Sequence, residues 1–296
     1  MDALVLAAGE GRRLRPLTLT QPKPALPFLH APMIRFALRA VVAAGATRVF
    51  VNAFHRAKGL ASLLPPLEAA LGVPLELVRE PVLRGTGGAL GALAGRVKGD
   101  LLLVVNGDVL VADALGPLVA AHRAGAHVAT MLVTRAARPE LPRSVGVAGG
   151  RVRVLRQGAP GSHAPRVFTG AHAISREGLA SLPALGDVVD EGYLPWLRAG
   201  ASVGAVEAQE AWEDLGTLAR FAEAQLAPAP AFADAPGVHP GARVVEGARL
   251  GRVVLGPGAI VAGDADLDEV VVLPGARVGG RWRRVVVPAS GPPVPF

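Results

Sequence analysis

A glycine-rich turn near the amino terminus combines open backbone with concentrated positive charge. Residues 3–8 form an apolar run without alternation, which is typical of a buried parallel strand, and the run ends abruptly at glycine. Gly9 and Gly11 carry no Cβ, so the backbone between them can turn sharply and bring its N–H groups close to an anion. Four cations share the stretch: Arg12, Arg13, Arg15 and Lys23. This charge beside bare backbone suits a triphosphate better than a neutral metabolite.

Two familiar phosphate motifs are absent from this stretch. A dinucleotide-binding fingerprint would need a third glycine at position 14, where the chain has Leu14, and a P-loop would need Gly-Lys followed by Ser or Thr. A strand followed by a glycine-rich turn is also common in α/β proteins that bind no phosphate there. The turn alone therefore leaves both interpretations open.

Two further stretches carry groups that suit a ligand site. Glu80 precedes a glycine loop with Gly85 and Gly88, although such glycines also serve close packing of a helix on a sheet. Residues 101–105 are the most uniformly apolar run, as expected at the centre of a parallel sheet, and they are followed by Asn-Gly and Asp108. Asn-Gly is typical of a hairpin turn, but ligands of open α/β sheets bind beyond the carboxyl ends of strands, and a carboxylate there suits magnesium.

The elements that must position these groups alternate between strand and helix. The first part of the chain is predicted to contain a helix at 31–44, a strand at 47–52, a helix at 57–71 and a strand at 75–78. Such alternation predicts an α/β fold with a parallel sheet covered by helices. The later part is predicted to contain a strand at 128–134, a hairpin of 144–147 and 151–155, a helix at 188–199 and a strand at 203–206.

The carboxyl-terminal part has a different period. Residues 227–237 are rich in proline and alanine and predict a linker between a domain of residues 1–226 and a second domain of residues 238–290. Beyond the linker, aliphatic residues recur every six positions with one slip in register, at Val238, Val244, Leu250, Val261, Leu267 and Leu273. This hexapeptide pattern is typical of a parallel β-helix, here with about three coils of ~18 residues.

Composition limits the possible partners. The chain has 296 residues, a formal charge of +7 and no cysteine. Its arginines are scattered and no basic run is interleaved with aromatic residues, which argues against nucleic-acid binding. No apolar stretch reaches the ~18 residues of a membrane span, and no signal-peptide pattern is visible. We therefore expect a cytoplasmic protein without disulfides and without a membrane partner.

The amino-terminal stretch resembles the signature of the sugar-1-phosphate nucleotidyltransferases, Leu-x-x-Gly-x-Gly-x-Arg-Leu-x-Pro-Leu-Thr followed by Lys-Pro. The matching residues are Leu6, Gly9, Gly11, Arg13, Leu14, Pro16, Leu17, Thr18, Lys23 and Pro24. A second family motif, Trp-x-Asp-x-Gly-Thr, matches at residues 212–217. The resemblance spans essentially the whole chain. It implies a Rossmann-like domain with a mostly parallel sheet, followed by a short left-handed parallel β-helix.

The resemblance also implies a reaction, in which an NTP and a sugar 1-phosphate give an NDP-sugar and pyrophosphate. The residues implied in nucleotide binding are Leu6, Ala8, Gly9, Gly11, Arg13, Glu80, Gly85 and Gly88. Those expected near the sugar phosphate are Asn106, Gly146, Arg166, Thr169, Gly170 and Glu191. Asp108 and Asp214 are implied as the ligands of Mg²⁺. Arg13 would stabilise the departing phosphates, and Lys23 would offset the developing charge.

The sequence departs from the family at one place. Many relatives carry Glu-Lys-Pro near positions 157–160, where the first two residues hold the sugar hydroxyls and phosphate, but this chain has Gln-Gly-Ala-Pro. Our hypothesis is that Arg166 supplies the missing cation, while groups such as Glu191 help to choose the sugar.

Several substrates and roles stay open at this point. Residues 168–170 and the appended β-helix look most like mannose-1-phosphate guanylyltransferases. Glucose-1-phosphate thymidylyl- and uridylyltransferases and MurNAc-1-phosphate uridylyltransferases share the signature. A catalytically silent subunit that binds a sugar nucleotide is an alternative of another class, although the intact charged positions argue against it. The β-helix also suggests a homo-oligomer.

Overall fold

The chain forms two compact units. The computed structural model of the protein describes residues 1–111, 115–135, 144–155, 164–209, 212–227 and 237–296. Unit 1 comprises Met1–Gly9 and Phe36–Trp212, and unit 2 comprises Glu10–Arg35 and Glu213–Phe296. We call Glu10–Arg35 the signature segment; it belongs with the carboxyl-terminal part of the chain. The predicted boundaries at residues 226 and 238 stay a prediction, and the compact units follow different boundaries.

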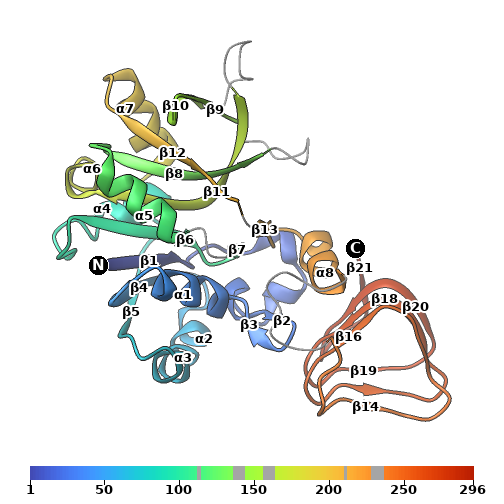
Figure 1. Cartoon of the computed structure of the whole chain (residues 1–296). Coiled ribbons are helices and arrows are strands. Elements are labelled where there is room, and N and C mark those ends of the chain that lie inside the picture. The colour runs from blue at the N-terminus through green and yellow to red at the C-terminus, as the bar shows by residue number, and fades with distance from the viewer. Residues whose placement is uncertain (112–114, 136–143, 156–163, 210–211, 228–236) are drawn as a thin grey trace. The chain divides into compact units, whose positions relative to one another are not determined.

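Unit 1 is built on a nine-stranded sheet whose first half is parallel. β1 (Asp2–Leu6) lies between β4 (Arg48–Ala53) and β6 (Leu101–Asn106), and β5 (Leu75–Arg79) pairs with the other edge of β4 (Figure 1). The apolar runs predicted as strands at 3–8 and 101–105 correspond to β1 and β6. Both are almost wholly buried, as expected for central parallel strands. The short strand β7 (Val109–Val111) follows β6.

The second half of the sheet is mixed, which corrects the expectation of a mostly parallel sheet. Its strands are β8 (Ala129–Arg135), β9 (Ser144–Ala148), β10 (Arg151–Leu155), β11 (Ala164–Ser175) and β12 (Val203–Glu207). β12 is parallel to β8, but β11 is antiparallel to β6, β8 and β9. Only Gly149 and Gly150 join β9 to β10, so these two strands form the predicted antiparallel hairpin, since a parallel neighbour needs a crossover of about a dozen residues or more.

Helices connect the strands of unit 1. They are α1 (Ile34–Ala43, whose first two residues belong to unit 2), α2 (Ala57–Ala61), α3 (Leu64–Leu71), α4 (Gly85–Gly91), α5 (Leu115–Ala124), α6 (Arg176–Ala180), the π-helical turn η4 (Val189–Tyr193) and α7 (Leu194–Arg198). The single helix predicted at 57–71 is divided into α2 and α3 just before Pro65 and Pro66, because proline has no N–H to continue the helical ladder. In the described part of the chain, no helix is long and apolar enough to cross a membrane.

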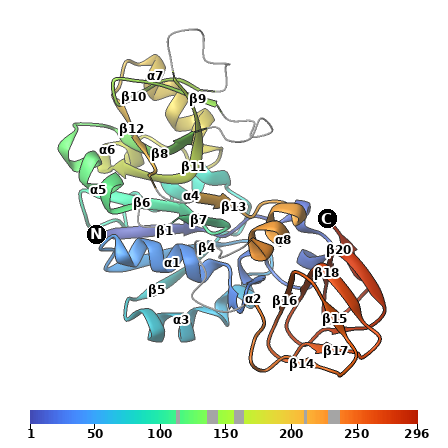
Figure 2. The same cartoon turned by 45° about the vertical axis from the view of Figure 1, so that its right-hand side comes forward.

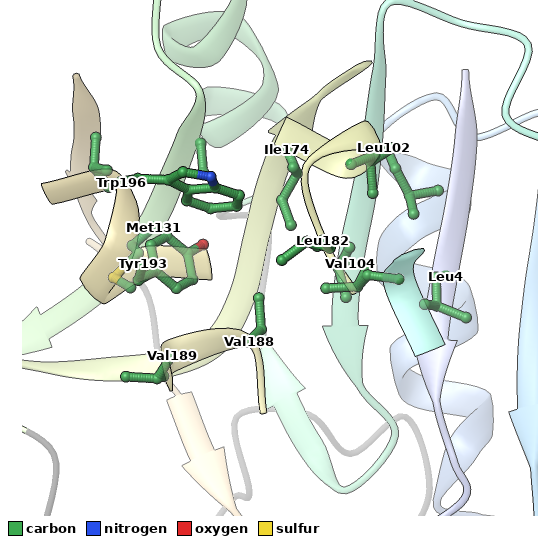
Figure 3. Close-up of a cluster of buried hydrophobic side chains, with 14 of the residues drawn as sticks. Leu4, Leu102, Val104, Met131, Ile174, Leu182, Val188, Val189, Tyr193 and Trp196 are labelled. Atoms are coloured by element: carbon green, nitrogen blue, oxygen red, sulfur yellow. The ribbon is translucent and has the colours of Figure 1, made fainter. Parts of the chain in front are cut away.

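One buried cluster fixes the segment after α6 to the sheet of unit 1. In Figure 3, Leu4 and Val104 from neighbouring strands contribute to the same cluster as Val188, Tyr193 and Trp196 from η4, α7 and the residue before them. All five side chains are at most 8% exposed. Burial of each large apolar side chain contributes roughly 1.5–3 kcal/mol, so the residues that flank η4 are held firmly.

Unit 2 begins with a compact, largely irregular segment. It contains the 3₁₀ helices η1 (Arg12–Leu14), η2 (Leu17–Leu19) and η3 (Lys23–Ala25) and the hairpin of β2 (Pro27–Phe28) and β3 (Ala31–Pro32). Leu14, Leu26 and Phe28 are wholly buried and give this segment its own core contacts. The chain re-enters unit 2 within β13 (Trp212–Asp214) and continues into α8 (Leu218–Leu226).

The rest of unit 2 is a stack of parallel strands (Figure 2). The strands are β14 (Arg243–Val244), β15 (Arg249–Leu250), β16 (Val253–Leu255), β17 (Ile260–Val261), β18 (Asp266–Val272), β19 (Arg277–Val278) and β20 (Arg281–Val287), with β21 (Val294–Pro295) antiparallel to β20. We call residues 237–296 the coil segment. Arg243 is in register with Ile260, and Ile260 with Arg277, so one coil takes 17 residues (260 − 243 and 277 − 260).

The predicted hexapeptide positions differ in burial along the coil segment. Val261 and Leu267 are wholly buried in its core, as the aliphatic recurrence indicates. Val238, Val244 and Leu250 are each more than a third exposed. The last three lie in the first described coil, where β14 and β15 each pair with a strand on one side only.

Candidate active site

Gly11 closes the signature turn in a left-handed backbone conformation, with φ of 64°. A Cβ at this position would lie 2.8 Å from Thr18 Cγ2 and 3.0 Å from Lys23 Cβ. The Thr18 hydroxyl donates a hydrogen bond to the Gly11 carbonyl oxygen over 2.9 Å. Gly9 differs, because no atom beyond its chain neighbours lies within 4 Å of where its Cβ would be. Gly11 is thus required by the turn itself, whereas the backbone at Gly9 is open to a ligand.

The two predicted catalytic cations lie on neighbouring 3₁₀ helices. Lys23 begins η3 and is 9% exposed, whereas Arg13 is an exposed residue of η1. A Cβ at Gly216 would lie 3.0 Å from Arg13 Nη2 and 2.6 Å from Asp214 Oδ1. Gly216 therefore lets the Arg13 guanidinium approach the turn that carries Asp214. Within unit 2 the structure brings together these two residues, which are far apart in the sequence.

Asp214 is oriented by groups at the start of α8. Its Oδ1 accepts a hydrogen bond from the Gly216 N–H over 2.7 Å, and its Oδ2 accepts one from Arg220 Nη1 over 2.9 Å. The helix cap predicted as the alternative role of Asp214 is supplied by Thr217, whose hydroxyl accepts from the Arg220 N–H. Asp214 is left to present a fixed, half-buried carboxylate.

Glu80 forms part of a buried network at the carboxyl ends of the first strands. Its Oε1 accepts a hydrogen bond from Asn52 Nδ2 over 2.8 Å, and Asn52 Oδ1 accepts one from the Ala7 N–H over 2.7 Å. Glu80 Oε2 accepts from the Arg84 N–H over 3.1 Å. Each carboxylate oxygen has two lone pairs, so Glu80 is fixed in place and can still accept hydrogen bonds from a ligand.

The glycines of the second loop are explained by close packing in unit 1. A Cβ at Gly85 would lie 2.5 Å from the Gly186 carbonyl oxygen, and one at Gly88 would lie 2.5 Å from the Ala184 carbonyl oxygen. A Cβ at Gly186 would in turn meet Glu191 Cγ at 2.4 Å. Gly85 and the exposed residue Glu191 thus both lie against Gly186. Nucleotide binding by Gly85 and Gly88 stays a prediction beside this packing role.

Asn106 and Gly170 meet beside the end of β6. Gly170 has φ of 85°, and a Cβ there would lie 2.5 Å from Asn106 Nδ2, so only glycine fits. The preceding residue is anchored on both sides: the Thr169 hydroxyl donates to the Leu132 carbonyl oxygen, and the Thr169 carbonyl oxygen accepts from Trp212 Nε1, each over 2.9 Å. The predicted sugar residues Asn106, Thr169 and Gly170 are therefore close together and rigidly held.

Asp108 follows β6 as predicted. The Gly107 N–H donates to the Leu6 carbonyl oxygen over 2.9 Å, which joins the turn before Asp108 to the end of β1. Asp108 is half-buried, and Ala8 on the neighbouring loop is buried. Asp108 belongs to unit 1 and Asp214 to unit 2, and their joint binding of magnesium stays a prediction.

Arg166 has a strong partner in unit 1. Its Nε and Nη2 donate to Glu207 Oε2 over 3.0 and 2.8 Å, and Arg135 Nε donates to Glu207 Oε1 over 2.8 Å. Hydrogen bonds from these two arginines hold the pKa of the Glu207 carboxyl below its usual value. Gly146 lies opposite Pro165, next to Arg166, in the β9–β11 pair. The predicted departure at residues 157–160 lies outside the described residues.

A buried polar pair lies beneath the predicted sugar residues. His172 Nδ1 and the Tyr193 hydroxyl are 2.5 Å apart, and both side chains are at most 1% exposed. Burial lowers the pKa of His172 to about 3 and raises the pKa of Tyr193 well above its usual value. Both groups are therefore neutral at pH 7. Their hydrogen bond joins β11, which carries Gly170, to η4, which carries Glu191.

Three residues of the candidate site were not predicted. Asn52 joins Glu80 to β1, Arg220 pairs with Asp214, and Glu207 pairs with Arg166. Asn52 carried a usable signal, because a polar amide ends an otherwise apolar predicted strand. Arg220 lies one helical turn after the second motif, but neither it nor Glu207 shows its partner in the sequence.

The chain is similar to known nucleotidyltransferases. Residues 2–148 match the family model described as "Nucleotidyl transferase". A mannose-1-phosphate guanylyltransferase of Mycobacterium tuberculosis is 32% identical over 274 residues, which cover 86% of this chain and 75% of that protein. A mannose-1-phosphate guanylyltransferase catalytic subunit beta of Dictyostelium discoideum is 32% identical over 140 residues, which cover 47% of this chain and 39% of that protein.

A solved structure supports the fold. A Bacillus anthracis chain assigned as a glucose-1-phosphate thymidylyltransferase superposes with a TM-score of 0.63 at 21% identity, over 74% of this chain and 91% of that chain. At this identity the likeness concerns the fold alone. Together with the mycobacterial relative and the two matched motifs, it shows that the chain belongs to the sugar-1-phosphate nucleotidyltransferase family.

Proposed function

We propose that this protein is a mannose-1-phosphate guanylyltransferase, which converts GTP and mannose 1-phosphate to GDP-mannose and pyrophosphate. The observation that carries the proposal is the 32% identity to the mycobacterial enzyme across 86% of the chain, with both family motifs in place. The charges at the motif positions suit a transferase better than a silent binding subunit, because Arg13, Lys23, Asp108 and Asp214 are all retained.

Glu80 supports guanine as the base. Guanine presents two adjacent N–H donors on its Watson–Crick edge, and a carboxylate can accept both because it has acceptors only. Thymine and uracil present one N–H between two carbonyl acceptors, which a carboxylate would repel. The hydrogen bonds from Asn52 and from the Arg84 N–H orient Glu80 for such a role.

The acidic residues suit a hard divalent cation. Each oxygen of Asp214 accepts one protein hydrogen bond and retains a lone pair for a metal, and Asp108 would supply a second carboxylate. Within the described residues no cluster of three or more His, Cys, Asp or Glu side chains gathers. A magnesium ion would therefore complete its shell with substrate oxygens and water. When bound, it would neutralise phosphate charge.

The chemical step needs alignment more than covalent help. A sugar-phosphate oxygen attacks the α-phosphorus and pyrophosphate leaves, so two anions must be held together. We assign Arg13 to the departing phosphates and Lys23 to the charge that develops at the α-phosphoryl group. The open backbone at Gly9 and the fixed turn at Gly11 support placing the triphosphate in the same loop.

We place the sugar phosphate near Asn106, Gly146, Thr169, Gly170 and Glu191, with Arg166 as the cation for its phosphate. The close approach of Asn106 to Gly170 supports a shaped site there. The Arg166 guanidinium can bind an anion with the donors that it does not give to Glu207.

We further propose that the coil segment is a left-handed parallel β-helix and that it supports a homo-oligomer in a cytoplasmic enzyme. The parallel register, the 17-residue coils and the aliphatic core support the β-helix. The exposed aliphatic residues of the first coil support an association surface.

One experiment tests the proposed function. Pyrophosphate release is measured over a matrix of GTP, ATP, UTP and dTTP against mannose, glucose and N-acetylmuramic acid 1-phosphates, with magnesium. We expect GTP with mannose 1-phosphate to give the highest kcat/KM. A preference for dTTP or UTP with another sugar would replace this substrate assignment, and no turnover with any pair would favour a silent subunit.

A further inference from the structure

The tip of the β2–β3 hairpin is held by a residue near the end of the chain's last helix. The hairpin begins two residues after η3, which carries Lys23, and its tip is Leu29-His30. Leu29 has φ of 53°, a left-handed conformation that is uncommon for a branched side chain, and the residue is 4% exposed. Its buried N–H needs an acceptor that no strand partner supplies.

Gln225 supplies that acceptor. Its Oε1 accepts a hydrogen bond from the Leu29 N–H over 2.8 Å, and its Nε2 donates to the Phe221 carbonyl oxygen over 3.2 Å. Gln225 is 3% exposed, so both ends of a buried amide are satisfied within unit 2. A buried polar side chain with both ends used favours one arrangement of the two segments.

Gln225 and the Asp214 turn lie at opposite ends of α8. Asp214 and Gly216 precede the helix, where the Arg13 guanidinium approaches Gly216, whereas Gln225 lies on its last turn. The signature segment therefore meets α8 twice, through Arg13 at its beginning and through Leu29 at its end. Lys23 lies between these two contacts in the sequence. Movement of α8 would displace both proposed catalytic cations together.

The coil segment holds the same junction. The rings of His30 and His239 are in edge-to-face contact, with centroids 4.9 Å apart. Arg284 on β20 pairs with Glu223 on α8 over 3.2 Å. The coil segment thus contacts both the hairpin tip and the helix that Gln225 joins.

We propose that Gln225 is a positioning residue, which sets the placement of Arg13 and Lys23 through the hairpin tip and α8. This inference rests on the proposed transferase function for its kinetic consequence. Both cations act on charge that develops during phosphoryl transfer, and a displacement of about 1 Å can cost ~100-fold in rate. Loss of the Gln225 acceptor should therefore lower kcat more than it raises either KM.

The test compares two substitutions at one site with a control elsewhere in the unit. Gln225→Met keeps the length of the side chain and removes the acceptor, whereas Gln225→Glu keeps an acceptor for Leu29. Val261→Ala removes buried volume from the coil core, where Val261 is wholly buried and lies on β17. Turnover is measured per folded molecule, and amide hydrogen exchange is measured for residues 10–35.

We expect Gln225→Met to lower kcat by ~10-fold or more, with both KM values changed less than ~3-fold. Gln225→Glu should recover most of the loss. Exchange across residues 23–33 should rise in Gln225→Met and stay unchanged in Val261→Ala, although Val261→Ala lowers stability. If Gln225→Met does not fold, Gln225→Asn, which withdraws the acceptor by one methylene, takes its place with the same expectations.

Unchanged kcat in folded Gln225→Met, or an equal loss in Val261→Ala, would overturn the positioning role. Unchanged exchange in the signature segment of Gln225→Met would also overturn it. Failure of the proposed function is separable, because a wild-type protein without turnover still reports the exchange difference between the variants.

Discussion

Arg220 donates a hydrogen bond to Asp214 over 2.9 Å, so a proposed metal ligand is already paired with a cation in the folded protein. The Arg220 side chain is 14% exposed and the Asp214 side chain 22% exposed. A cation that binds Asp214 must therefore share or displace this partner. The pair defines a carboxylate whose affinity for metal depends on an arginine that neither family motif contains.

We expect Arg220→Ala to tighten magnesium binding, because the substitution removes a positive charge that competes for Asp214. The apparent magnesium constant from turnover should fall by ~3-fold or more, and Mn²⁺ binding followed by calorimetry should tighten in the same direction. Arg123→Ala, which removes an exposed pair with Asp100, is the control. Weaker metal binding in Arg220→Ala would instead mean that the arginine mainly orients the carboxylate.

Asp108→Asn and Asp214→Asn should each reduce pyrophosphate release by ~100-fold or more, because an amide is a poor replacement for an anionic magnesium ligand. Circular dichroism and thermal unfolding check that both variants fold, and Asp264→Asn in the coil segment is the matched control. Near-normal turnover of either variant at low magnesium would remove that carboxylate from the metal site.

Glu80→Gln should change the choice of base. The amide nitrogen presents donors where guanine presents donors, so kcat/KM for GTP should fall by ~10-fold or more while the values for UTP and dTTP fall less. Glu76→Gln, an exposed position on the same strand that pairs with Arg96, should leave the base preference unchanged. An equal loss for all NTPs would show that Glu80 acts only through its network with Asn52.

Arg166→Ala should raise the KM for sugar 1-phosphate by ~10-fold and leave the KM for NTP nearly unchanged, since a lost charged hydrogen bond contributes at least ~1.4 kcal/mol. Arg135→Ala provides the control, because Arg135 pairs with the same Glu207 carboxylate but its side chain is 83% exposed. Equal effects on both substrates, or none on either, would limit Arg166 to its ion pair.

Stability should fall as the pH is lowered from 6.5 toward 4.5. Burial lowers the pKa of His122, His127 and His172, in the last case to about 3. The unfolded chain takes up protons below about pH 6.5 while folded His172 does not, so the stabilisation present above pH 6.5 is lost on acidification, by ~1.4 kcal/mol per pH unit for a fully shifted histidine.

Urea unfolding at several pH values measures this slope. His172→Gln, which removes the titrating group with the lowest pKa of the three, should flatten the dependence although it loses the Tyr193 hydrogen bond. His55→Gln should leave the dependence as it is in the wild type. An unchanged slope in His172→Gln would assign the acid sensitivity to other groups.

The sequence predicts the parts of the site that depend on short motifs. Gly11 and Asp108 were identified because a turn or a strand end determines their place, and apolar runs predicted β1 and β6. The mixed half of the sheet was not predicted, because strand direction beyond β6 depends on which strands pair. The junction of Gln225 and Leu29 was also missed, since its partners are 196 residues apart and neither residue carries a motif.

The discontinuous composition of unit 2 has a consequence for synthesis on the ribosome. The signature segment ends at Arg35, and its partners begin at Glu213, which is made 178 residues later (213 − 35). At ~5–20 residues per second this interval is roughly 9–36 s. During it, Leu14, Leu26 and Phe28 have no completed core to enter. We therefore expect unit 1 to fold first on the nascent chain, and these apolar side chains to be a target for chaperones until the last coil is translated.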